Sequence, residues 1–164
     1  MNKYSLVSNY TVKQFKVYTS KYNEDDDPNI LDRNFSRDSL EVVVSDLTYV
    51  NVAGKWNYIC IIMGLLNREI IGYTAGSRKD ASLVYQAFSS CKYPLNKISI
   101  FHTDRGNEFK NKLIEDVLRT FGITSSLSKK DCPYDNAVAE SLYHIIKTEF
   151  VRKRKFKSIK ALEI

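Results

Sequence analysis

The chain has 164 residues, of which 43% are hydrophobic and 27% are charged, values typical of a single soluble globular domain with its own core. The longest apolar run, residues 59–63, is too short to cross a membrane, and the N-terminus lacks the apolar core of a signal peptide. The formal net charge of +6 favours an anionic partner, most commonly a nucleic acid, and no membrane partner is expected.

The cysteines bear on the compartment. Cys60, Cys91 and Cys132 are odd in number, far apart and without the Cys-X-X-Cys spacing of a zinc or redox motif. This pattern argues against a disulfide framework and against a zinc site. It favours a reducing compartment, so we expect a cytoplasmic protein.

The first segment of the chain, residues 1–38, is polar and has no sustained hydrophobic period. It contains the acidic run 24–27, which Pro28 follows. We interpret this run as a solvated loop rather than a cation site. We therefore predict an extended leader or linker over residues 1–38 and an ordered core over residues 39–164.

Three strand-like segments open the core. Residues 40–50 are rich in β-branched side chains, and residues 56–66 are apolar enough to be buried on both faces of a sheet. Residues 69–76 form the third segment, and turns at 51–55 and 67–68 separate the three. Short turns between consecutive strands predict an antiparallel meander.

The hydrophobic period then becomes that of a helix. Residues 80–93 carry apolar side chains at positions i, i+3, i+4 and i+7, which predicts a helix. A strand over 97–101 follows, and then a second helix that Gly122 should end. The segment 123–127 is predicted to be a short fifth strand.

A third helix is predicted after residues 132–136. Its apolar stripe, which we expect to face the core, consists of Val138, Leu142, Ile145 and Ile146.

Taken in order, the elements are three strands followed by helix, strand, helix, strand and helix. This order predicts an α/β fold with a mixed five-stranded sheet flanked by helices. In that sheet, two parallel strands join the antiparallel meander. It is the element order of a ribonuclease-H-like domain.

Three acidic residues occupy notable positions on this scheme. Asp46 lies in the first strand, Asp104 follows the fourth, and Glu140 lies early in the last helix, pointing away from its apolar stripe. Two neighbouring strands and a helix packed across their ends would bring the three side chains together. Taken singly, they are equally well explained as an edge-strand polar residue, a turn former and a surface helix residue.

Converging carboxylates would suit hard divalent cations, Mg²⁺ or Mn²⁺. Two such ions, roughly 3.5–4 Å apart, activate a water or a 3′-hydroxyl and stabilise the leaving oxygen in phosphodiester chemistry. The residues alone therefore leave a two-metal site and three unrelated surface carboxylates open.

The residues around these carboxylates match a known family. SDLTYV with Asp46, FHTDRGNEF with Asp104 and SKKDCPYDNAVAES with Glu140 closely resemble the Asp-Asp-Glu core of retroviral-integrase-type transposases, in particular bacterial insertion-sequence family three. Thirty-five residues separate Asp104 from Glu140, and Lys147 stands seven positions after Glu140; both intervals are typical of that group. The resemblance runs from about residue 29 to the C-terminus.

The resemblance implies that Asp46, Asp104 and Glu140 are metal ligands and catalytic residues. It implies a Mg²⁺-dependent polynucleotidyl transferase that cleaves transposon ends and joins them to target DNA without a covalent enzyme intermediate. It also implies a nucleoid-associated bacterial protein that pairs with a second copy or with a full-length transposase.

Polar residues around the last helix are candidate DNA contacts. Asn136 and Lys147 share the helical face of the glutamate, so Lys147 is expected to reach a phosphate near the metals. His144 lies nearly on the same face, where an incidental surface histidine would look the same. The basic tail is expected to bind phosphates without sequence selectivity, and it includes Arg152 and Arg154.

The flanking residues have expected roles of their own. Gly106 should permit the turn after the second aspartate, and Asp135 or Asn136 should cap the last helix. Two positions depart from the family pattern: Val43 stands where tryptophan is common, and Asp131 where glycine is usual. A positive φ is therefore expected at Asp131.

The comparison with the family bears on the completeness of the chain, and it leaves two alternatives to an active transposase core. Its members carry an upstream helix-turn-helix region and continue beyond the equivalent of Ile164, so we predict a C-terminally truncated catalytic core. A catalytically inactive remnant that binds DNA or a full-length transposase is the first alternative. A ribonuclease H or resolvase-type nuclease is the second, and the 35-residue interval and the PYDNAVAES block argue against it.

Overall fold

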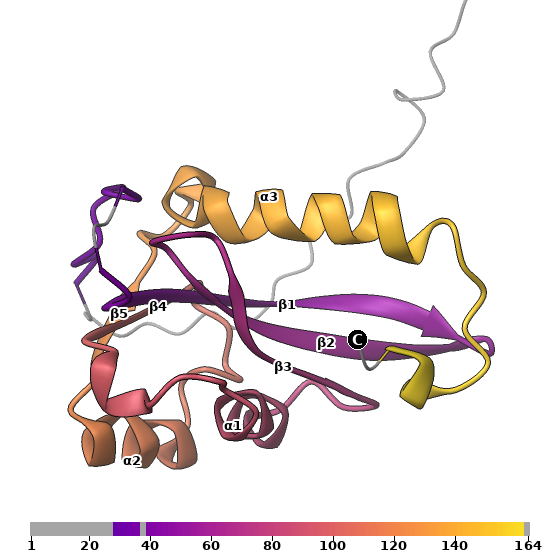
Figure 1. Cartoon of the computed structure of the whole chain (residues 1–164), viewed down its shortest axis with the longest axis horizontal. Helices are drawn as coiled ribbons and strands as arrows, with labels where there is room; N and C mark the ends of the chain where they lie inside the picture. The colour runs from indigo at the N-terminus through magenta and orange to yellow at the C-terminus, as the bar shows by residue number, and fades with distance from the viewer. Residues whose placement is uncertain (1–27, 37–38, 163–164) are drawn as a thin grey trace, which may run out of the picture.

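A computed structural model describes residues 28–36 and 39–162. Its centre is one five-stranded sheet with the strand order β3-β2-β1-β4-β5 (Figure 1). The first three strands pair antiparallel, whereas β4 pairs parallel with both β1 and β5. The mixed sheet predicted from the sequence is confirmed, with strands β1 (Val42–Val52), β2 (Lys55–Gly64), β3 (Ile70–Gly76), β4 (Ile100–Thr103) and β5 (Thr124–Leu127).

Helices cover both faces of the sheet. The helices α1 (Ala81–Ser89) and α2 (Lys112–Phe121) lie on one face, and α3 (Ala137–Ile145) lies across the other (Figure 1). A wider, π-helical turn continues α3. Short 3₁₀ turns complete the set, so that the irregular helical segments are Leu95–Lys97, Pro133–Asn136, Ile146–Val151 and Ile159–Leu162.

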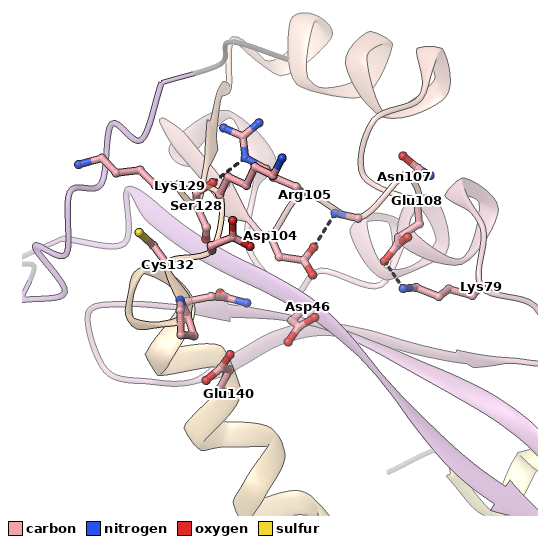
Figure 2. Close-up of a pocket in the computed structure, with 15 residues that line it drawn as sticks. Asp46, Lys79, Asp104, Arg105, Asn107, Glu108, Ser128, Lys129, Cys132 and Glu140 are labelled. Atoms are coloured by element: carbon pink, nitrogen blue, oxygen red, sulfur yellow. Dashed lines mark hydrogen bonds and ion pairs between the residues drawn. The ribbon is translucent and has the colours of Figure 1, made fainter. Parts of the chain in front are cut away.

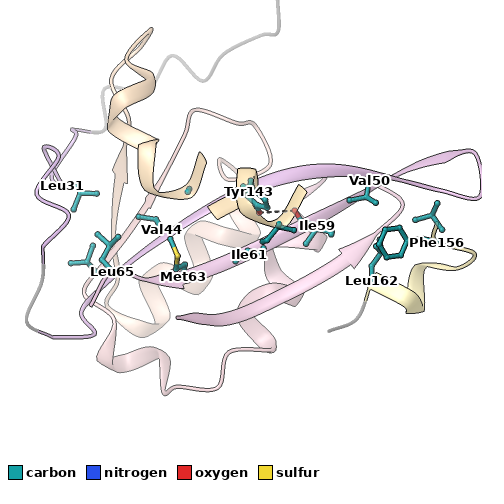
Figure 3. Packing of buried hydrophobic residues seen from close by; sticks show 14 residues of the cluster. Leu31, Val44, Val50, Ile59, Ile61, Met63, Leu65, Tyr143, Phe156 and Leu162 are labelled. Atoms are coloured by element: carbon teal, nitrogen blue, oxygen red, sulfur yellow. Dashed lines mark hydrogen bonds between the residues drawn. The ribbon is translucent and has the colours of Figure 1, made fainter. Parts of the chain in front are cut away.

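Alternating side chains of the central strands divide the core into two layers. Val43 and Ile62 face α1 and α2, whereas Val44 and Met63 face α3. The layer under α3 is drawn in Figure 3. Much of β2 is buried on both faces, as predicted for residues 56–66, and the first half of β1 is buried on both faces as well.

Local signals set several helix ends, and the predicted end at Gly122 is confirmed, whereas α1 stops at Ser89, before the predicted end at residue 93. Asp80 and Asn111 accept hydrogen bonds from the first turns of α1 and α2. Gly122 ends α2 with a φ of 69°, the left-handed conformation that glycine adopts without strain.

The predicted apolar stripe of α3 is partly wrong. Ile145 is 54% exposed, while Ala139, Tyr143 and Ile146 make up the buried face. Tyr143 packs its ring in the core and donates its hydroxyl hydrogen bonds to main-chain oxygens, a use that a hydrophobic pattern does not reveal.

The segment 28–36 lies against the core. Leu31 is 1% exposed and belongs to the layer under α3. Most of the predicted leader, residues 1–27 and 37–38, lies outside the described residues, so the boundary at residue 38 stays a prediction. No helix in the described part of the chain is long and apolar enough to span a membrane.

Candidate active site

Two carboxylates meet at the end of the parallel strand pair. The parallel register of β1 and β4 ends at the pair Ser45–Thr103. Asp46 and Asp104 are the residues that follow this pair, one on each side. Neighbouring strands lie about 4.8 Å apart, and this register therefore places the two aspartates side by side. The fold reproduces the juxtaposition that the sequence predicts for this pair.

Both aspartates line a cavity of about 670 Å³. Glu140, from the first turn of α3, lines it from the opposite side (Figure 2). The cavity wall also includes residues of the loop after β4 and of the loop before α3, namely Arg105, Gly106, Asn107, Glu108, Ser128, Lys129, Lys130, Asp131, Cys132, Pro133 and Asn136, together with Lys79.

The three carboxylates share this cavity without forming a closed cluster. Glu140 is exposed, and within the described ranges no group of three His, Cys, Asp or Glu side chains is close enough to hold a metal ion. The structure thus brings Asp46 and Asp104 together and sets Glu140 across from them.

Asp46 lies in an unfavourable place for a charge. Burial, followed by the negative charge of Asp104, raises the pKa of Asp46 to about 7, against the opposing effect of a 2.7 Å hydrogen bond from the Leu47 N–H. One oxygen of Asp104 likewise accepts a 2.9 Å hydrogen bond from the Gly106 N–H. Negative charge at the cavity floor is therefore only partly neutralised by the protein.

An ion pair with a buried carboxylate, which sequence reasoning missed, forms another part of the wall. Lys79 Nζ lies 3.0 Å from Glu108 Oε1, and the Glu108 side chain is 6% exposed (Figure 2). A Cβ on Gly106 would lie 2.4 Å from Glu108 Oε1, so the glycine is needed for space beside this pair. The sequence signal for this pair was Glu108, four positions after Asp104. Its partner Lys79 lies too far away in the sequence for a local pattern to reveal the pair.

The helix that carries Glu140 is not anchored by a conventional cap, which corrects the prediction for Asp135 and Asn136. The Asn136 side chain makes no capping bond. Asp135 instead turns away from the helix and accepts hydrogen bonds from Arg33 Nε at 2.6 Å, Asn29 Nδ2 at 2.8 Å and the Lys129 N–H at 2.9 Å. These partners are up to 106 residues distant, whereas capping rules consider only neighbours along the helix.

His102 connects β4, β5 and the start of α3 beneath the cavity. Its ring is fully buried, with Nδ1 2.9 Å from Ser126 Oγ and Nε2 3.1 Å from the Asp135 carbonyl oxygen. Burial lowers its pKa, so the neutral ring acts as a connector between β4, β5 and the start of α3.

The predicted positive φ at Asp131 is confirmed at 58°. This places the residue that replaces the usual glycine in the left-handed region, within the cavity wall.

The predicted DNA-contacting residues fall in different places. Asn136 lines the cavity and is 6% exposed. Lys147 is not part of the lining; its ammonium lies 4.7 Å from the centre of the Tyr49 ring. His144 and Arg152 are exposed. Arg154 lies over the Phe150 ring at 4.3 Å, at the far end of the π-helical turn.

The cavity nevertheless fits a divalent metal ion chemically. Its carboxylates supply the oxygen donors that Mg²⁺ prefers, and burial followed by the charge of Asp104 raises the pKa of Asp46, so a bound cation would stabilise its ionised form. The buried Oδ1 atom of Asn136 also lacks a hydrogen-bond partner among the described residues, as expected where a ligand or its water would supply one.

Comparisons with known proteins show similarity to an integrase domain family and to bacterial transposases. Residues 37–133 match the family described as "Integrase core domain", a span that includes Asp46 and Asp104. The chain is 30% identical over 162 residues to the transposase for insertion sequence element IS904 of Lactococcus lactis, covering 96% of this chain and 62% of that protein. It is 32% identical over 115 residues to transposase InsF for insertion sequence IS3A of Escherichia coli, covering 68% of this chain and 39% of that protein.

A solved structure shares the fold. The HTLV-2 integrase catalytic core domain in complex with magnesium matches with a TM-score of 0.58 at 14% identity, covering 69% of this chain and 70% of that one. This likeness confirms the ribonuclease-H-like architecture. The chain spans less than two thirds of the length of the two transposases named above.

Proposed function

The chain belongs to the integrase core domain family, and from that premise we propose that it is the catalytic core of a transposase, cleaving and joining DNA strands when a mobile element moves. Its similarity to the transposases of two bacterial insertion sequences supports this proposal. The expected setting is the nucleoid of a bacterial cell, with transposon ends and target DNA as substrates.

One observation carries the chemical part of the proposal. Asp46 and Asp104 follow the last paired residues of two adjacent parallel strands and face one cavity with Glu140. Both strands are buried in the sheet, so their ends are rigid, and the two carboxylates are held in fixed relation to each other.

Asp46, Asp104 and Glu140 would hold the metal, with two ions as the proposed number. Bound Mg²⁺ would supply Lewis acidity at the scissile phosphate and lower the pKa of an attacking water or 3′-hydroxyl. The Lys79–Glu108 pair keeps the opposite wall in place, and the Gly106 N–H orients one oxygen of Asp104. Ionised Asp46 is the form that binds a cation.

DNA contacts are assigned to basic and polar groups on the α3 side of the molecule. Asn136 lies in the cavity wall, where its amide is available to a phosphate or to a bound water. Lys147, His144, Arg152 and Arg154 follow along α3 and its π-helical extension. We propose that they bind the DNA backbone and that a second copy or a longer transposase completes the assembly.

A catalytically inactive remnant that still binds DNA is the second candidate. The observation in its favour is that the carboxylates, within the described part of the chain, are not gathered closely enough to hold an ion. If the chain is instead an active transposase core, Glu140 has to move toward the aspartates when metal and DNA bind.

The deciding experiment measures Mg²⁺-dependent cleavage and joining of duplexes that carry the terminal sequences of the encoding element. The wild-type chain is compared with Asp104→Asn and with Asp116→Asn, a matched change on the exposed face of α2. We expect Asp104→Asn to lower the rate roughly 100-fold or more and Asp116→Asn to leave it unchanged.

Equal rates in the wild type and Asp104→Asn would refute the catalytic assignment. DNA binding without turnover in all three proteins would establish the remnant instead.

A further inference from the structure

Two large aromatic side chains stand exposed on the hairpin formed by β1 and β2. Tyr49 is 55% exposed and Trp56 is 59% exposed. Their ring centres lie 5.1 Å apart with the planes at 89°, an edge-to-face contact that holds the pair in a defined shape. Solvent reaches most of Trp56, although burying such a ring is among the largest apolar gains available to a protein.

The pair lies beside an open strand edge close to the candidate active site. β4 ends at Thr103, so residues 46–51 of β1 have no strand partner on that side within the described sheet register, until Val52 bridges to Phe156. Tyr49 follows Asp46 by three residues along the same strand, a distance of about 10 Å. Side chains three residues apart leave opposite faces of a strand, so the two rings flank the aspartates outside the cavity lining.

A cation accompanies the pair. Lys147 Nζ lies 4.7 Å from the centre of the Tyr49 ring, which is the geometry of a cation–π contact. Lys147 forms no ion pair with a carboxylate in the described part of the chain. Its charge thus remains available to a phosphate while the aromatic ring holds it in position.

The basic tail passes the tip of the same hairpin. Val52 bridges to Phe156, and the Ala53 N–H donates a 3.0 Å hydrogen bond to the Phe156 carbonyl oxygen (Figure 1). This contact fixes near the hairpin a stretch of chain whose cationic residues are Arg152, Lys153, Arg154, Lys155 and Lys157.

We propose that Trp56, buttressed edge-on by Tyr49, stacks against an unpaired DNA base while Lys147 neutralises a neighbouring phosphate. Aromatic rings flanked by cations are the recurring means of holding single-stranded nucleic acid, because every base offers a π-face and every nucleotide a charge. Cationic surroundings disfavour a second copy of the same basic chain as the occupant. The proposal rests on the proposed function, in which DNA is the substrate.

Trp56 is the only tryptophan of the chain, so tryptophan emission reports on this site alone. The probe is a mixed-sequence single-stranded oligonucleotide of about 12 nucleotides, added to the chain in metal-free buffer. We expect saturable quenching of the emission and protection of Trp56 from acrylamide, both weakening as salt rises.

Affinity is measured in parallel by anisotropy of a dye-labelled copy of the oligonucleotide. We expect Tyr49→Ala and Trp56→Ala each to weaken binding roughly five-fold or more, and Trp56→Phe to retain most of the affinity. The matched control is Tyr85→Ala, which removes a 43% exposed aromatic ring from α1, outside the β1–β2 hairpin. It should bind like the wild type, and circular dichroism of each variant should be native.

Binding of the oligonucleotide with unchanged Trp56 emission and unchanged acrylamide access would overturn the proposal while leaving DNA binding intact. Acrylamide protection that rises with protein concentration in the absence of DNA would overturn it in favour of a second copy. Failure to bind the oligonucleotide would also overturn it. The cleavage assay with Asp104→Asn does not depend on Trp56 and tests the proposed function separately.

Discussion

Asp46 shows at the scale of one residue how a candidate active site stores unfavourable charge. Its carboxylate is partly buried on β1, next to the point where the parallel pairing with β4 ends and beside a second carboxylate. Burial and the charge of Asp104 raise its pKa to about 7, so the folded chain binds this proton more tightly than the unfolded chain, whose pKa is 3.8. A bound divalent ion would relieve the same repulsion.

The first prediction concerns Asp46→Asn in metal-free buffer. Because the folded-state pKa is raised, the free energy of unfolding of the wild type falls as pH rises from about 4 to 7. The uncharged variant escapes this loss and retains the oxygen that accepts from the Leu47 N–H. We expect it to be more stable than the wild type by about 2 kcal/mol at pH 8 and by less at pH 5, in urea unfolding.

The comparison variant is again Asp116→Asn, whose effect should be small and the same at both pH values. Added Mg²⁺ should stabilise the wild type at pH 8 and stabilise Asp46→Asn less. A stability difference independent of pH would contradict the assignment of the raised pKa to this carboxyl group.

At the scale of elements, the start of α3 is held by contacts that come from the opposite end of the chain. Asp135 accepts from Asn29 and Arg33, while Ser126 Oγ accepts from the backbone N–H groups of Ile30 and Leu31 at 3.0 and 3.3 Å. The segment 28–36 thus ties β5 to the turn that leads into α3. The position of Glu140 at the cavity depends on this tie.

The second prediction is that Asp135→Ala destabilises the chain by about 2 kcal/mol, because it removes the acceptor shared by Arg33, Asn29 and the Lys129 N–H. Burial alone would raise the pKa of Asp135, but the hydrogen bonds from Arg33 and the Lys129 N–H lower it. Its stabilising effect should therefore be present above pH 4 and be lost as pH falls further. Urea unfolding at pH 7 and pH 3 measures both effects.

Asp116→Ala, which removes an exposed carboxylate on α2, should change the free energy of unfolding by no more than about 0.5 kcal/mol. If Asp135→Ala were equally mild, the tie between the segment 28–36 and α3 would be dispensable.

At the scale of the whole molecule, positive charge is concentrated in the basic tail that follows α3 and its π-helical extension. The chain carries 25 Lys and Arg against 19 Asp and Glu, and five of these cations fall between positions 152 and 157. The acidic cavity borders the start of α3, and the basic tail follows the π-helical turn that continues this helix. The field of the tail therefore attracts a polyanion to the side of the molecule where the carboxylates lie.

The third prediction concerns the combined variant Arg152→Ala with Arg154→Ala. It should bind DNA of any sequence more weakly, and the plot of log K against log salt should become less steep by about 1 per arginine. The control combines Arg78→Ala with Arg119→Ala, which removes the same charge from exposed sites where each arginine pairs with a carboxylate of its own region. Salt titrations of anisotropy measure both slopes, and equal slopes would exclude the tail from the DNA interface.

Much of this molecule was predictable from sequence, because strand and helix periods are local. Alternating and 3.6-residue patterns placed all five strands and three helices, and they put Asp46 within the first strand and Asp104 directly after the fourth. The positive φ at Asp131 was suggested instead by the family resemblance, in which glycine is usual at that position.

Only the tertiary structure decided how distant groups meet. Asp135 was expected to cap its own helix and instead binds Arg33, 102 positions away, while Ile145 turned out to be exposed and Lys147 to rest on Tyr49. A sequence pattern determines which face of an element is apolar, because that depends on spacing along the chain. Which polar groups become partners depends on the packing of elements, and this is decided only when the whole chain has folded.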